Sequence, residues 1–186
     1  LDIRHRIKDK ELLVSVIPEN IVLQSPTLQE VANHLDAEIL YGEDLMGKQV
    51  YRYSVAAMQM QNYLKHISEN CLVITPGDRG DIILSALQAH QSQNYPPISG
   101  ILLSTPLLPD STIKKLLDGL PSAVPILSVE SNTYNTVSDL ATLVSYIMPD
   151  SHHKITISKK LFEKYVDTPV LEQMISNVRV RGITPK

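Results

Sequence analysis

The chain has 186 residues, of which 43% are hydrophobic and 20% charged, and 17 lysines and arginines against 20 acidic residues give a net charge of −3 at pH 7. This composition excludes a disordered chain and predicts a compact, water-soluble protein with one domain or at most two small ones. The slight negative charge also argues against a nucleic-acid partner, whose affinity depends on clustered lysine and arginine side chains.

Hydrophobic spacing predicts alternating strands and helices along the chain. Short apolar runs predict strands at 12–17, 38–41, 50–55, 72–75, 100–103 and 126–129. Between them, Thr27 is expected to cap a helix that buries Leu28, and Asp110 to cap one that ends at Gly119. An apolar stripe predicts a further helix over 137–148 that is stopped at Pro149, and a last helix carries Leu161, Phe162, Tyr165 and Val166.

From residue 72 onward, strands and helices follow one another strictly. The runs at 72–75 and 100–103 are almost continuously apolar, as expected of parallel strands covered on both faces. We therefore predict an α/β protein, a three-layer α/β/α sandwich with a mostly parallel, Rossmann-like sheet. The alternating Tyr51 and Tyr53 indicate an edge strand or an antiparallel strand in the less regular first half.

The sequence contains no apparent membrane span or signal peptide and a single cysteine, and these features indicate where in the cell the protein is expected. No apolar run is long enough to span a membrane, and residues 1–6 lack the apolar core of a signal peptide. Cys71 is the only cysteine, which excludes an internal disulfide and a zinc site built from several thiolates. A lone thiol fits a reducing compartment. We expect a cytoplasmic protein with no membrane partner.

Several motifs resemble catalytic or cofactor signatures but are incomplete. The loop from Gly42 to Lys48 matches a phosphate-binding loop except at its last position, where Gln49 lacks the hydroxyl that binds Mg²⁺. Two acidic residues inside it and a strand-like run after it favour an ordinary turn. The adjacent His152 and His153 diverge and have no further ligands nearby in sequence. We therefore expect no catalytic residue, no metal and no cofactor.

Three polar loops are the best candidates for function. Loop 75–81 joins a buried strand to a helix, and loops 104–106 and 130–134 follow the next two strands, so all three are expected at the carboxyl edge of the sheet, where ligands bind in such folds. The candidate ligand or interface residues are Thr75, Gly77, Asp78, Arg79, Asp81, Ser104, Thr105, Glu130, Asn132 and Thr133.

A purely structural interpretation of the same loops is also available. In it, Asp78 caps the following helix and Arg79 pairs with a carboxylate such as that of Glu130. Two acidic residues outweigh one arginine in loop 75–81, so a bare phosphate site is not favoured there.

The segments 70–87, 98–105 and 124–134 resemble the DRTGG domain. Segments 16–20, 26–31 and 179–186 are similar to the sequence around that domain in the middle, regulatory region of long-form bacterial phosphate acetyltransferases, so the resemblance covers roughly residues 14–186. This chain keeps Asp78-Arg79 but has Ser104-Thr105-Pro106 where the family has Thr-Gly-Gly. The change removes backbone freedom and one N–H donor.

The resemblance implies a division of the chain into three parts. Residues 1–20 would be a lead-in strand or remnant of a preceding domain, 21–150 the DRTGG-like domain, and 151–186 a helical appendage and linker toward an absent catalytic domain. The parent enzyme would interconvert acetyl-CoA and phosphate with acetyl phosphate and CoA.

On this basis the segment itself would be a non-catalytic regulatory or oligomerisation domain. Its expected partners are a small-metabolite effector, the adjoining domains of the parent chain and further copies in a homo-oligomer. Two alternatives stay open: a purely structural homo-oligomerisation module, and a nucleotide-binding domain that uses the loop from Gly42 to Lys48.

Overall fold

A computed structural model describes residues 13–120, 124–149 and 151–176. The chain divides into two compact units, one of residues 24–146 and one that joins residues 1–23 to residues 147–186. All of the sheet and all of the candidate site residues lie in the first unit.

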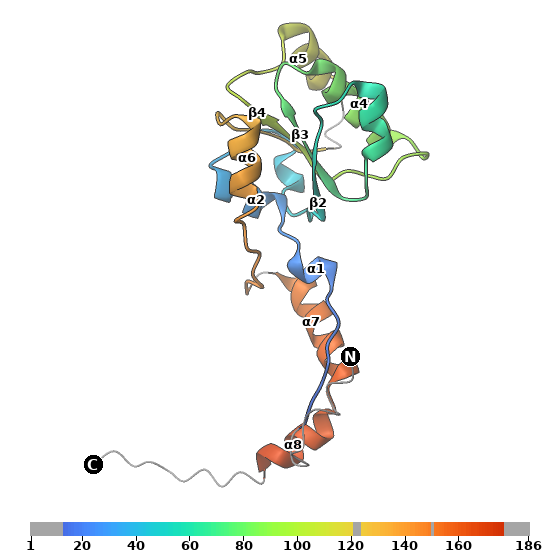
Figure 1. The fold of residues 1–186 in the computed structure, drawn as a ribbon, viewed down its shortest axis with the longest axis vertical. Coiled ribbons are helices and arrows are strands. Elements are labelled where there is room, and N and C mark those ends of the chain that lie inside the picture. The colour runs from blue at the N-terminus through green and yellow to red at the C-terminus, as the bar shows by residue number, and fades with distance from the viewer. Residues whose placement is uncertain (1–12, 121–123, 150, 177–186) are drawn as a thin grey trace, which may run out of the picture. The chain divides into compact units, whose positions relative to one another are not determined.

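The first unit is built on a five-stranded sheet with the order β1-β5-β4-β3-β2 (Figure 1). The strands are β1 (Glu38–Tyr41), β2 (Arg52–Val55), β3 (Cys71–Pro76), β4 (Gly100–Ser104) and β5 (Ile126–Ser128). Strands β2 to β5 run parallel, and β1 pairs antiparallel with β5. The predicted α/β class with a mostly parallel sheet is confirmed. Of the two possibilities for the tyrosine-bearing strand, β2 is a parallel edge strand.

Helices cover both faces of this sheet, as Figure 1 shows. One face carries α3 (Met60–Tyr63), α4 (Gly80–Gln91) and α5 (Ser111–Asp118), and the other carries α2 (Leu28–Leu35) and α6 (Thr133–Leu140). Short 3₁₀ turns occupy Glu43–Leu45 (η2) and Leu64–His66 (η3). Successive side chains of a strand point to opposite faces, so Val73 packs toward α4 and Leu72 toward α2. This accounts for strands that are apolar at every position.

Helix α2 begins as the sequence predicts. The Thr27 hydroxyl accepts a hydrogen bond from the Glu30 backbone N–H at 3.2 Å, and the Glu30 carboxylate accepts one from the Thr27 N–H at 2.8 Å. These reciprocal bonds form a capping box that satisfies two donors at the helix start. The predicted cap of α5 by Asp110 is confirmed too, since its carboxylate accepts from two N–H groups of the first turn.

Substitution of Thr27 by alanine tests the energetic value of the capping box. We expect Thr27→Ala to lower the free energy of unfolding by about 1 kcal/mol, because one N–H loses its acceptor. Urea denaturation followed by far-UV circular dichroism measures the change. Gln88→Ala is a suitable control, since Gln88 is an exposed residue within α4 and takes no part in a helix cap. Equal losses in the two variants would contradict the prediction.

The helix predicted over 137–148 is wrong beyond Leu140. Helix α6 ends there, and the backbone closes with a short-range bond from the Thr142 N–H to the Asp139 carbonyl at 2.9 Å. The Thr142 hydroxyl donates to the same carbonyl at 2.7 Å. Local bonds of this kind compete with helical hydrogen bonds. The helix therefore stops at Leu140, although the apolar periodicity of the sequence continues beyond it.

The strand predicted at 12–17 is also wrong wherever the structure describes it. Residues 13–17 have no regular secondary structure, and residue 12 lies outside the described residues. The described part of their unit contains no strand with which they could pair. An apolar run without a sheet neighbour cannot form strand hydrogen bonds.

The second unit contains α7 (His152–Tyr165) and α8 (Thr168–Ser176), and α1 (Ile21–Gln24) lies where the chain passes between the units. The helix predicted from Leu161 and Phe162 is confirmed as α7. Several of its apolar side chains are exposed, as are those of α8, including Phe162 at 41% and Ile175 at 63%. Within the described ranges, every helix is too short or too polar to cross a lipid bilayer. Segment 179–186, used in the resemblance, lies outside these ranges.

Candidate functional site

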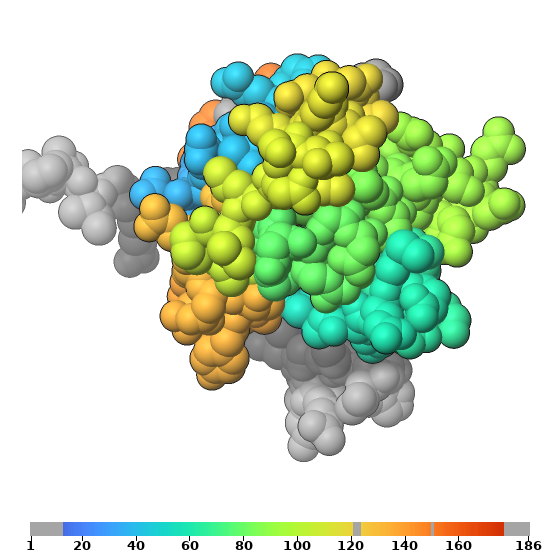
Figure 2. All heavy atoms as spheres, turned by 90° about the horizontal axis from the view of Figure 1, so that it is seen from above, coloured from blue at the N-terminus to red at the C-terminus, as the bar shows by residue number. Residues whose placement is uncertain are grey.

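The three polar loops meet at the carboxyl edge of the sheet. The Gly77 N–H donates to the Ser104 carbonyl at 3.2 Å, and the Thr105 N–H donates to the Ser131 carbonyl at 2.8 Å. The hydroxyls of Ser104 and Thr133 share a further hydrogen bond of 2.7 Å. Figure 2 shows the start of α4, the segment after β4 and α6 side by side on one face. We call loops 75–81, 104–106 and 130–134 the carboxyl-edge cluster.

Gly77 allows two of these loops to touch. A Cβ built on Gly77 would lie 1.7 Å from the Leu107 carbonyl oxygen and 2.7 Å from its carbon. No side chain fits against a backbone group at that distance. The loop after β3 therefore packs directly on the loop after β4, and the space between them is filled by main chain.

Arg79 binds a carboxylate of its own loop. Its guanidinium donates to both oxygens of Asp81, at 2.8 Å and 2.9 Å, and to the Met58 carbonyl at 3.1 Å. The predicted pairing of Arg79 with a neighbouring carboxylate is confirmed, but the partner is Asp81 and not Glu130, which the sequence analysis gave as an example. Asp81 lies only two residues away and offers a bidentate partner without any ordering of a distant loop. Glu130 is exposed.

The predicted helix cap at Asp78 is also wrong. Helix α4 starts one residue later, with Arg79 at the N-cap position, and the side chain at this position makes no capping hydrogen bond. Asp78 itself is exposed. By contrast, Asn132 does cap α6, since its side-chain oxygen accepts from the Asn135 N–H at 2.9 Å. Asn132 therefore has at α6 the capping role that was predicted for Asp78 at α4, whereas the Asp78 carboxylate is exposed and interacts with Arg79 through its charge.

A pair of matched aspartates tests this difference. We expect Asp78→Ala to change the free energy of unfolding by no more than about 0.5 kcal/mol, as for an ordinary surface position. Asp110→Ala should destabilise the protein clearly more, because Thr112 and Ile113 lose the acceptor of their backbone N–H groups. Chemical denaturation of the two variants in parallel gives the comparison. A larger loss at Asp78 would restore the capping interpretation.

The ion pair in loop 75–81 has a pH signature. The hydrogen bond from Arg79, with smaller help from backbone N–H groups, holds the pKa of Asp81 below its usual value of 3.8. A carboxyl with a lowered folded-state pKa contributes stability above its unfolded pKa of about 3.9, and this contribution is lost as the pH falls through the folded value. Because the Asp81 side chain is 48% exposed, the contribution should stay below about 1 kcal/mol.

We expect Asp81→Asn to lose less stability than the unchanged protein on acidification from about pH 5 to pH 2. The free energy of unfolding at several pH values measures this. Asp78→Asn is the control, because it removes a carboxylate from the same loop without removing an ion pair. Identical acid profiles for all three proteins would disprove the assignment.

Two threonines of the cluster carry buried hydroxyls without partners. Thr75 is fully buried, and its Oγ1 has no hydrogen-bond partner in the described structure. The Oγ1 of Thr105 is likewise buried and unpartnered, and the Thr105 backbone has φ of 73°. A β-branched residue rarely adopts this left-handed conformation. The sequence signal for this strained position is Thr105 itself, which stands where the Thr-Gly-Gly pattern has a glycine.

The loop from Gly42 to Lys48 does not have the architecture of a phosphate-binding loop. Gly42 has φ of 76°, and 3₁₀ turn η2 follows it. The N–H groups of Leu45 and Lys48 donate to carbonyls inside the turn, at 2.9 Å and 3.1 Å, instead of pointing at a common centre. The chain then continues toward strand β2, whereas a phosphate-binding loop opens a helix.

The chemistry available in the carboxyl-edge cluster is that of a binding or contact surface. It offers one arginine, exposed carboxylates, hydroxyls and main-chain groups, and no nucleophile hydrogen-bonded to a base. Among the residues that the structure describes, no three histidine, cysteine or acidic side chains gather where they would hold a metal ion.

Comparisons with known proteins agree with one another. Residues 30–143 match the DRTGG domain family. The phosphate acetyltransferase of Synechocystis sp. is 41% identical over 185 residues, which are 99% of this chain and 26% of that protein. The phosphate acetyltransferase of Nitratidesulfovibrio vulgaris is 43% identical over 176 residues, 94% of this chain and 25% of that protein. The chain thus spans about a quarter of the length of the curated relatives it matches.

A solved structure is also similar. It is the crystal structure of the CBS and DRTGG domains of the regulatory region of Clostridium perfringens pyrophosphatase, complexed with its activator diadenosine tetraphosphate. The match has a TM-score of 0.49 and 16% sequence identity, and it covers 77% of this chain and 64% of that one.

Proposed function

The chain belongs to the DRTGG domain family, and from this premise we propose that it is a non-catalytic regulatory segment of a phosphate acetyltransferase. The relatives support this, because the chain aligns almost from end to end with only a quarter of each enzyme. The longer enzyme would exchange acetyl groups between CoA and phosphate. We assign that reaction to another part of the enzyme, because the carboxyl-edge cluster offers no nucleophile paired with a base.

The observation that carries the proposal is the convergence of the three loops. Each follows a core strand, so a ligand or a neighbouring domain that touches the cluster contacts β3, β4 and β5 at once. Rigid secondary elements of this kind are among the parts of a protein that carry energetic coupling between distant sites. We propose that a small-metabolite effector or an adjoining domain contacts the cluster through Asp78, the Arg79–Asp81 pair and the exposed Glu130.

A second candidate function is homo-oligomerisation by the helical unit. It is favoured by the exposed apolar side chains of α7 and α8, since large apolar surfaces of this kind usually contact another protein. Phe162, Met174 and Ile175 belong to this set. Light scattering at increasing protein concentration tests it, and a monomer at every concentration would rule it out.

A segment exchange tests the regulatory proposal directly. The corresponding segment of the Synechocystis enzyme is replaced by this chain, and formation of acetyl phosphate is measured with and without a panel of nucleotides and central metabolic acids. We expect an active chimera whose rate responds to at least one compound. Arg79→Ala in the chimera should weaken the response, and the surface variant Lys65→Ala, which lies outside the carboxyl-edge cluster, should leave it unchanged.

The outcomes separate the alternatives. Activity that responds to no compound and does not differ from that of an enzyme lacking the segment would overturn the regulatory proposal. Acetyl transfer to phosphate by the 186-residue chain alone would overturn its non-catalytic assignment. A response that survives Arg79→Ala would place the effector elsewhere than at the carboxyl-edge cluster.

A further inference from the structure

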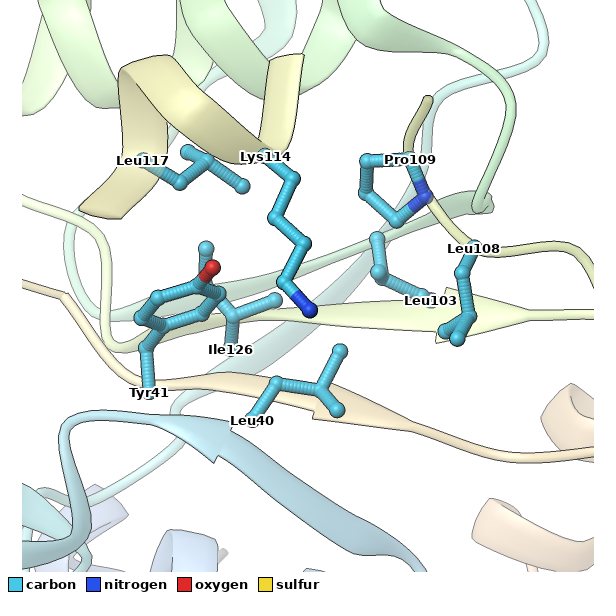
Figure 3. Close-up of a pocket in the computed structure, with 8 residues that line it drawn as sticks. All are labelled: Leu40, Tyr41, Leu103, Leu108, Pro109, Lys114, Leu117 and Ile126. Carbon is cyan, nitrogen blue, oxygen red and sulfur yellow. The ribbon is translucent and has the colours of Figure 1, made fainter. Parts of the chain in front are cut away.

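A pocket of about 120 Å³ lies on the side of the sheet that carries α5 (Figure 3). Leu40, Leu103 and Ile126 of three adjacent strands form one wall, Leu117 of α5 another, and Leu108 of the preceding loop stands at the side. The pocket is partly open to solvent. It is thus a preformed apolar hollow beside the carboxyl-edge cluster, and none of the candidate residues of that cluster lines it.

One cation enters this apolar space. The Lys114 side chain runs from α5 across the pocket, and its amino group points toward the strands instead of away from the protein (Figure 3). A lysine on an exposed helix usually extends its ammonium group into water, where hydration is strongest. The Lys114 side chain is itself exposed to solvent, but its ammonium group stands over leucine and isoleucine side chains, so a bound anion would meet both a positive charge and an apolar wall.

The carboxylates near Lys114 are already engaged with other groups. Asp118, one turn further along α5, accepts a hydrogen bond from the Tyr41 hydroxyl at 2.6 Å. Asp110, one turn before, accepts from the backbone N–H groups of Thr112 and Ile113. In the part of the chain that the structure describes, Lys114 forms no ion pair. Its charge is therefore available to a ligand.

The Tyr41–Asp118 pair also limits what the pocket accepts. Hydrogen bonding to the carboxylate raises the pKa of Tyr41 to about 12, so the phenol stays neutral at physiological pH. Its ring adds apolar surface to the pocket while its hydroxyl is committed to Asp118. Asp118 adds negative charge at the rim, which disfavours a multiply charged anion more than a singly charged one.

We infer that this pocket binds a small monoanionic organic acid whose carboxylate pairs with Lys114 and whose aliphatic body lies against the leucine and isoleucine wall. An engineered cavity of about 150 Å³ holds a benzene molecule, so a pocket slightly smaller than that suits a body of roughly four to six heavy atoms. A single lysine with apolar neighbours fits a carboxylate better than a phosphate group, which usually needs several donors. The inference goes beyond the proposed function, which concerns the carboxyl-edge cluster.

Nuclear magnetic resonance on the 186-residue chain tests the inference with butyrate as the probe. We expect saturable shifts of the backbone amide signals of Leu40, Lys114, Leu117 and Ile126, with an affinity on the order of millimolar, as so few heavy atoms allow. Butanol presents the same body without charge and should bind about tenfold more weakly, because it lacks a charged hydrogen bond. Butylammonium should not bind, since its charge repels that of Lys114.

Variants of two neighbouring lysines separate charge from packing. Lys114→Met keeps an apolar stem and should weaken butyrate binding about tenfold, to the level of butanol. Lys114→Arg keeps the charge and should retain most of the affinity. Lys115→Met is the matched control: Lys115 is exposed on the same helix and does not line the pocket, so butyrate binding should be unchanged. Dispersed amide spectra of all three variants verify that each is folded.

Three results would overturn the inference: no saturable shift at the pocket residues, equal affinity of Lys114→Met and unchanged protein for butyrate, or equal affinity for butyrate and butanol. Shifts confined to loops 75–81, 104–106 and 130–134 would place the ligand in the carboxyl-edge cluster and would also exclude the pocket. Failure of the enzyme chimera to respond to effectors leaves these binding measurements unaffected, so the two proposals fail separately.

Discussion

Replacing Thr105 by glycine is expected to stabilise the protein by about 1–2 kcal/mol. The left-handed conformation costs a residue with a Cβ roughly 1–2 kcal/mol, and Thr105 has φ of 73°. Its buried hydroxyl has no partner, and leaving such a group unsatisfied costs a further 1–3 kcal/mol or so. Glycine removes both costs. Its greater conformational freedom in the unfolded chain offsets only about 0.5–1 kcal/mol of this gain.

Thermal and urea denaturation measure the gain. For a chain of this length, about 1 kcal/mol corresponds to a rise in Tm of roughly 2–4 °C. Thr105→Ala is the informative control, since it removes the hydroxyl but keeps the Cβ, and should recover only part of the gain. A Thr105→Gly variant less stable than the unchanged protein would show that neither the backbone strain nor the unsatisfied hydroxyl acts as argued.

The Thr105→Gly variant should also change the effector response of the chimeric enzyme. Strained backbone and unpartnered polar groups concentrate at binding and switch sites, where a ligand or partner compensates for them. If the Thr105 hydroxyl serves the proposed regulatory contact, Thr105→Gly should increase stability and weaken the effector response of the chimeric enzyme. An increase in stability with an unchanged response would assign Thr105 no part in that contact.

Replacing Gly77 by alanine is expected to destabilise the protein by about 2–3 kcal/mol. The new methyl group would fall 1.7 Å from the Leu107 carbonyl oxygen, which belongs to the backbone and has no rotamer by which to move away. Overpacking in a tight contact commonly costs about 1–3 kcal/mol. The loops after β3 and β4 must then separate, and the hydrogen bond from the Gly77 N–H to the Ser104 carbonyl lengthens or breaks.

Urea denaturation gives the loss of stability, and amide hydrogen exchange at residue 77 reports the broken contact. Gly47→Ala is a closely matched control, because a Cβ at Gly47 meets no atom within 4 Å and the position lies in a turn outside the cluster. Equal effects of the two substitutions would mean that loops 75–81 and 104–106 are not held together as described.

The order of strands and helices was readable from the sequence because it depends on local spacing. The runs that became β3 and β4 are apolar at successive positions, which only a strand buried on both faces requires. Thr27 and Asp110 could be predicted as helix caps because a capping side chain bonds only to residues within three positions of itself. The carboxyl-edge cluster followed from the same logic, since parallel strands connected by helices must place alternate loops on one edge.

Local spacing in the sequence could not predict which side chains and carbonyl groups bond to one another. Arg79 had several carboxylates within conceivable reach, and only the folded backbone brings Asp81 into bidentate geometry. The end of α6 at Leu140 likewise depends on a local competition in which the Thr142 hydroxyl takes a carbonyl of the last turn. The apolar pattern that predicts a longer helix carries no information about that competition.

The sequence by itself determined the α/β class, most of the elements and the edge of the sheet at which polar residues gather, because each of these depends on residues a few positions apart. The tertiary structure alone decided that Gly77 lies on Leu107, that Thr105 holds a left-handed backbone, and that Lys114 turns into a pocket walled by Leu40 and Ile126. These features join residues far apart in the chain, and their energies depend on close packing between elements, which sequence periodicity does not encode.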